Sequence, residues 1–71
     1  MLNANALRAS MVENNCSVRA LAEICGLKPK AFYQRLNGRV DFRVGEIIKC
    51  SGRLHLSVEK RNQIFFAEEV S

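Results

Sequence analysis

Two short helical patterns joined by one tight turn limit the folds that this chain can adopt. The first pattern covers residues 18–25 and follows Ser17, whose hydroxyl suits the N-cap of a helix. It stops at Gly26, the residue type that most easily takes the left-handed conformation after a helix. The second pattern covers residues 29–36 and begins at Pro29, which is favoured in the first helical position. We therefore expect a helix, a short turn and a second helix in direct succession.

Helical spacing of apolar residues covers nearly all of the remaining chain, and no stretch alternates long enough to predict a strand. A first helix is predicted from residue 3 or 4 to residue 13, a fourth from 43 or 44 to 52–54, and a fifth from 58 to about 68. The sequence thus predicts one all-α domain of five short helices over residues 1–71. In the last two helices the inward side chains are expected to be those of Val44, Ile47, Ile48, Ser51, Val58, Ile64, Phe65, Phe66 and Val70.

The positive charge is concentrated around the second of the two joined helices. Residues 28–43 hold five basic residues and one acid, whereas the other 55 residues hold six of each, so this segment carries the whole net charge of +4. A segment of one sign favours a polyanionic partner over a solvated face, on which the signs are usually mixed. The segment lacks the broad apolar face that insertion into an anionic membrane needs.

Several classes of protein are disfavoured by the sequence. No apolar run approaches the roughly 18 residues of a membrane span, and residues 1–10 are polar with Arg8, unlike a secretory signal. Three cysteines without a C-x-x-C pair, and the single histidine His55, do not supply the ligands of a zinc site. We expect no metal, no cofactor and no enzymatic activity, with free buried thiols and a cytoplasmic location in a bacterial host.

The segment SVRALAEICGLKPKAFYQRLNG, residues 17–38, resembles the helix-turn-helix of phage repressor and Cro-type proteins. Small Ala22 and Gly26 permit two helices to cross closely, and Leu27, Phe32 and Leu36 fill the angle between them. The likeness to small prophage-encoded members of this family (the xenobiotic-response-element type) extends over about residues 4–67. It implies a lambda-repressor-like fold and a transcriptional regulator that occupies an operator in double-stranded DNA.

The resemblance also implies a role for individual residues. The second helix crosses the DNA backbone and the third lies in the major groove. Base contacts are then expected from Lys28, Lys30, Tyr33 and Gln34, while Pro29 departs from the family, in which a polar side chain is common at this position. Phosphate contacts are expected from Ser17, Arg19, Arg35, Arg39 and Arg43.

The C-terminal apolar residues have two open interpretations. Phe65 and Phe66 lie about 100° apart on a helix, so we expect one ring to close the core. The other ring is expected either to cover the first helix or to form a homodimer contact, and the residues predicted for that contact, which would serve to bind two DNA half-sites, are Ile64, Phe65 and Phe66. The alternative is a protein-interaction module, an antitoxin or antirepressor, that binds a partner protein through residues 64–70.

Overall fold

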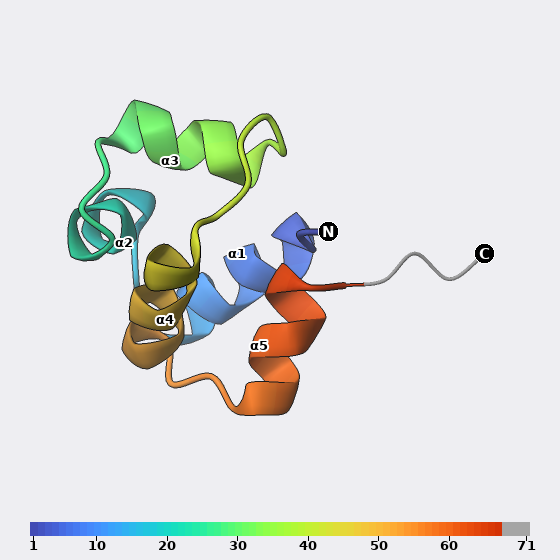
Figure 1. The fold of residues 1–71 in the computed structure, drawn as a ribbon. Helices are drawn as coiled ribbons and strands as arrows, with labels where there is room; N and C mark the ends of the chain where they lie inside the picture. The colour runs from blue at the N-terminus through green and yellow to red at the C-terminus, as the bar shows by residue number, and fades with distance from the viewer. Residues whose placement is uncertain (68–71) are drawn as a thin grey trace.

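The computed structural model describes residues 1–67, and that part of the chain contains five α-helices and no strand (Figure 1). This confirms the predicted all-α fold class. The second predicted helix is one residue shorter than expected, and the fifth ends at residue 65, with Phe66 as its C-cap. The expected contribution of Val70 falls outside the described residues. The helices are α1 (Ala4–Glu13), α2 (Val18–Ile24), α3 (Pro29–Leu36), α4 (Val44–Arg53) and α5 (Val58–Phe65).

Polar side chains close the starts of three helices. The Asn3 side-chain oxygen accepts the Ala6 amide at the start of α1. The Ser17 hydroxyl accepts a hydrogen bond from the Ala20 amide at the start of α2, and the Ser57 hydroxyl accepts one from the Lys60 amide at the start of α5. All three bonds measure 3.1 Å. Each satisfies one of the amides that a helix start leaves without a partner.

The first four helices end in the same way, with a residue of positive φ just after the C-cap. These residues are Asn15, Gly26, Gly38 and His55, with φ between +50° and +79°. In α2, the Gly26 amide donates to the Glu23 carbonyl at 3.0 Å and the Leu27 amide donates to the Ala22 carbonyl at 2.8 Å. This is the Schellman arrangement, which satisfies the last carbonyls of the helix and reverses the chain.

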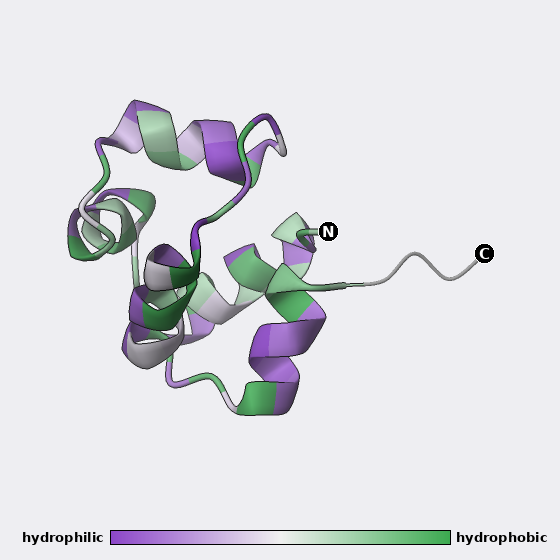
Figure 2. Ribbon diagram, in the orientation of Figure 1, coloured by the Kyte–Doolittle hydropathy of each residue, from purple (hydrophilic) through white to green (hydrophobic). Residues whose placement is uncertain are grey.

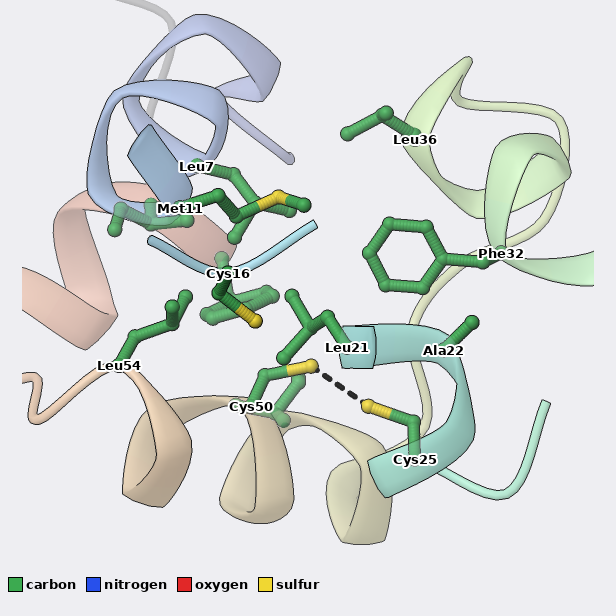
Figure 3. Close-up of a cluster of buried hydrophobic side chains, with 13 residues drawn as sticks. Leu7, Met11, Cys16, Leu21, Ala22, Cys25, Phe32, Leu36, Cys50 and Leu54 are labelled. Atoms are coloured by element: carbon green, nitrogen blue, oxygen red, sulfur yellow. Dashed lines mark hydrogen bonds between the residues drawn. The ribbon is translucent and has the colours of Figure 1, made fainter. Parts of the chain in front are cut away.

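Every helix contributes at least one fully buried side chain to the core. Leu7, Leu21, Phe32, Cys50 and Ile64 all lose their contact with solvent, and Figure 3 shows Leu7, Leu21, Phe32 and Cys50 pointing toward one another. Hydrophilic and hydrophobic bands alternate along α3, as expected of a helix with one face inward (Figure 2). The core therefore forms where the apolar faces of all five helices meet.

The predicted inward face of α4 is partly wrong. Val44 and Ile48 are 71% and 60% exposed, whereas Ile47, Cys50 and Leu54 are buried. The buried positions follow a helical stripe that is rotated from the expected one, because Cys50 rather than Ile48 faces the core. Val58 of α5, also expected inward, is exposed.

Helix α3 is held by α2 and by an aromatic contact. Helices α2 and α3 pack against each other, and α2 also packs against α4. In Figure 1, α2 is seen nearly end-on while α3 lies across the view, so their axes are strongly inclined. The Phe42 ring lies edge-to-face between Phe32 and Phe65, at centroid distances of 5.7 and 5.3 Å. Phe42 thereby connects α3 with α5.

Candidate nucleic-acid interface

The outward face of α3 carries the four side chains that the sequence predicts for base contact. Lys30, Tyr33 and Gln34 are spaced to share one face of the helix, and Lys28 stands at its N-cap. All four are exposed, whereas Phe32 on the other face is fully buried. Within residues 1–67 none of these four side chains makes a hydrogen bond or an ion pair. They are therefore free to meet an external partner.

The Gly26 turn determines how α3 is presented. With φ of +74°, Gly26 has a backbone conformation that L side chains rarely adopt. The turn brings fully buried Ala22 and Phe32 of the two helices into one core cluster. Because Ala22 has only a methyl group, α3 can approach α2 closely while its polar face stays outside.

Three arginines flank this face. Arg19 lies in the first turn of α2, and Arg39 and Arg43 lie in the segment between α3 and α4. All three are exposed, and no side-chain ion pair of theirs occurs in the part of the chain that the structure describes. Ser17, also exposed, already uses its hydroxyl as the cap of α2. Together with Lys28 and Lys30, the arginines make this side of the molecule strongly cationic.

Arg35 does not belong to that cationic surface, and its predicted phosphate contact is wrong. The residue is only 8% exposed. Its Nε donates to Glu46 Oε1 at 2.7 Å and its Nη2 donates to Glu46 Oε2 at 3.2 Å, while Nη1 donates to the Ala31 carbonyl at 3.2 Å. All three guanidinium nitrogens are thus used inside the molecule. Arg35 connects α3 to α4 instead.

Glu46 is the residue that sequence reasoning missed. It accepts both nitrogens of Arg35, and its Oε1 also accepts the Arg43 amide at 3.0 Å, which caps the start of α4. Burial acts to raise the pKa of Glu46, but the hydrogen bonds from Arg35 and Arg43 outweigh it and leave that pKa below its usual value. The carboxylate therefore stays charged at neutral pH. No local signal pairs two residues eleven positions apart on different helices.

The residues predicted for the dimer contact are divided between core and surface. Ile64 is fully buried, and Phe65 is buried against Phe42. The expectation that both form a dimer contact is wrong, because the core already uses their side chains. Phe66 is 52% exposed and is the one ring of the pair that faces outward. In the alternative partner-binding segment, residues 64–70, the same two side chains are buried in the core. Its positions 68–70 lie outside the described residues.

The cysteines and the histidine form no metal site within residues 1–67. The thiols of Cys16, Cys25 and Cys50 are free and buried, whereas His55 is exposed in the turn after α4. Within residues 1–67 no three side chains of the metal-ligating types come together. No helix in this range has the length and apolar character needed to cross a bilayer.

No protein-family model, no curated protein and no solved structure matches this chain.

Proposed function

We propose that the protein is a sequence-specific regulator that binds double-stranded DNA, with α2 and α3 acting as a helix-turn-helix. Helix α3 enters the major groove and the segment between α3 and α4 follows the DNA backbone. The protein acts as a repressor of the phage or prophage type by occupying an operator. The observation that supports this proposal is the unpartnered polar face of α3, bordered by exposed arginines.

The side chains on that face have the chemistry of base recognition. Lys30 is a donor for the O6 and N7 acceptors of guanine, and the amide of Gln34 can both donate to and accept from adenine. Tyr33 offers a ring for a thymine methyl group and a hydroxyl for a phosphate. Their spacing along one helix face lets the three residues contact successive bases from one side.

Backbone binding is assigned to the cations that are free of ion pairs. Arg19, Arg39 and Arg43 reach phosphates from both ends of α3, and the lysines add to the attraction. Each neutralised phosphate contributes about −0.9 to the slope of log K against log salt. With about four phosphates per subunit, we expect each bound subunit to contribute about −4 to this slope.

A homodimer would place two copies of α3 in successive major grooves. Half-sites bound by such pairs lie about 34 Å apart. The domain measures 34 × 25 × 20 Å, so two copies fit side by side at this separation. We assign the contact between copies to Phe66, the exposed ring at the end of α5.

Binding to DNA is tested by fluorescence anisotropy, first with random duplex at low and high salt. A preferred site is then selected from a random pool. Arg39→Ala should weaken binding to all duplexes alike and reduce the magnitude of the salt slope by about 1. Lys30→Ala or Gln34→Ala should cost about 1–3 kcal/mol on the selected site and much less on random DNA.

The matched control is Lys60→Ala, which removes an exposed cation from the first turn of α5, outside the assigned surface. This variant should bind like the unchanged protein. Absence of binding at low salt would refute the function. If Lys60→Ala weakened binding as much as Arg39→Ala, the assigned surface would be wrong.

A further inference from the structure

Two cysteine sulfurs from different helices are almost in bonding range. The Sγ atoms of Cys25 and Cys50 lie 2.8 Å apart (Figure 3), whereas a disulfide bond measures about 2.05 Å. A shift of less than an ångström therefore separates this thiol pair from a covalent link. Cys25 is 6% exposed and Cys50 is fully buried.

The surrounding backbone holds the two sulfurs toward each other. Cys25 is the C-cap of α2, and its amide donates to the Leu21 carbonyl at 3.0 Å. Its Sγ also lies 3.7 Å from the carbonyl oxygen of Glu46, one helical turn before Cys50 on α4. The Cys25 thiol thus contacts two residues, Glu46 and Cys50, that lie one turn apart on α4. Cys16, the third thiol, instead donates to the Ser17 carbonyl at 3.7 Å.

We propose that Cys25 and Cys50 form a reversible intramolecular disulfide when the protein meets hydrogen peroxide. Nothing in this proposal depends on DNA binding, because both sulfurs lie in the core and away from the exposed face of α3.

The reaction begins at Cys25, the less buried residue of the pair, which is 6% exposed whereas Cys50 is fully buried. The hydrogen bond from the Cys50 thiol lowers the pKa of Cys25, while the same bond and burial raise the pKa of Cys50. The Cys25 thiolate attacks one peroxide oxygen and releases hydroxide, which gives a sulfenic acid. The Cys50 sulfur then attacks the Cys25 sulfur. The sulfenic hydroxyl leaves as water with the thiol proton of Cys50, and the released hydroxide takes up the proton that the Cys25 thiol lost. Two thiols are thus oxidised and one peroxide becomes two waters.

The cross-link would close a loop that contains the Gly26 turn and all of α3. A loop of about 25 residues lowers the entropy of the unfolded chain enough to raise the midpoint of thermal unfolding by roughly 10–20 °C. Reduction with dithiothreitol should return the midpoint to its original value.

The full chain is treated with hydrogen peroxide, alkylated without reduction and digested with trypsin. The bond between Lys28 and Pro29 resists trypsin, so the three cysteines fall in separate peptides that cover residues 9–19, 20–30 and 50–53. The expected product links peptides 20–30 and 50–53, and the intact chain loses the mass of two hydrogen atoms. The same sample should show the raised unfolding midpoint.

Cys16→Ala is the matched control, since it removes a buried thiol outside the pair, and it should still give the linked peptides. Cys25→Ala should abolish both the link and the rise in midpoint, and Cys50→Ala should do the same if it folds. Links that contain peptide 9–19, links between two chains, or three thiols that all remain alkylatable after peroxide would each overturn the proposal.

Discussion

The ion pair between Arg35 and Glu46 makes a quantitative prediction about stability. Both side chains keep only about a tenth of their surface in contact with water, at 10% and 11%. Removing one partner of such a pair leaves the other charge buried, which typically costs about 3–5 kcal/mol. Because some solvent contact remains, we expect Arg35→Met to lower the free energy of unfolding by about 3 kcal/mol.

Glu46→Met should lower the free energy of unfolding more than Arg35→Met does. It breaks the same ion pair, and it also removes the acceptor of the Arg43 amide at the start of α4, which adds about 1 kcal/mol. The double variant leaves no unpaired charge and fills the site with two apolar side chains. It should therefore be more stable than either single variant.

The measurement is urea denaturation followed by circular dichroism, on the unchanged chain and the three variants. A domain of this length is expected to have about 4–10 kcal/mol of stability, so losses of this size are measurable. If the double variant lost the sum of the two single losses, the pair would not be coupled and the reasoning would fail. Arg35→Met should also leave the salt slope of DNA binding unchanged, because its guanidinium is not free to meet a phosphate.

Further predictions concern five single positions. Gly26→Ala should destabilise the fold by about 1–2 kcal/mol through backbone strain alone, because φ is +74° and an added Cβ would meet no atom within 4 Å. Gly52→Ala, in open space within α4, should instead stabilise the fold by about 1 kcal/mol. Urea denaturation checks both signs. His55→Gly should gain about 1 kcal/mol by the same assay, since the φ of His55 is +53°, and a loss would contradict the left-handed turn. Because the pKa of Glu46 is lowered, its contribution to stability is complete above the unfolded-state pKa of 4.5 and is lost as the pH falls through the folded-state pKa. Acid should therefore lower the free energy of unfolding of the unchanged chain more than that of Glu46→Met. Phe66→Ala should raise the dissociation constant of the dimer in sedimentation experiments with little change in unfolding free energy, and an unchanged dimer would exclude this ring from the contact.

The helices were predictable from the sequence because local chemistry defines their ends. Ser17 and Ser57 cap helix starts with their own hydroxyls, and Gly26 and Gly38 supply the left-handed residues that end α2 and α3. Pro29 begins α3 at the residue expected of it. These signals act within one turn of the helix, so they can be found without knowledge of the tertiary structure.

The errors lie where distant elements decide the outcome. Val44 and Ile48 are as apolar as Ile47, and only the packing of α4 against α2 and α5 determines which of them face inward. Arg35 has the charge of a phosphate ligand, but Glu46 lies close enough to neutralise it once α3 and α4 are in place. Apolar spacing and charge counts describe one element at a time, whereas these contacts join two elements.

The exposed polar side chains of the candidate interface were predictable for the opposite reason. Lys30 and Gln34 face outward because Phe32 and Leu36 occupy the inward side of the same helix, and this follows from helical geometry alone. What they contact depends on a molecule outside the chain.

The position of α3 depends on a small number of supports. Beyond its packing against α2, it is attached by the Phe32–Phe42–Phe65 contact and by the ion pair between Arg35 and Glu46. Loosening either attachment would leave α3 helical but change its tilt relative to the body of the domain. Substitutions at Phe42, a residue in no helix, should therefore alter the angle at which α3 meets a ligand while leaving every side chain on its outer face unchanged.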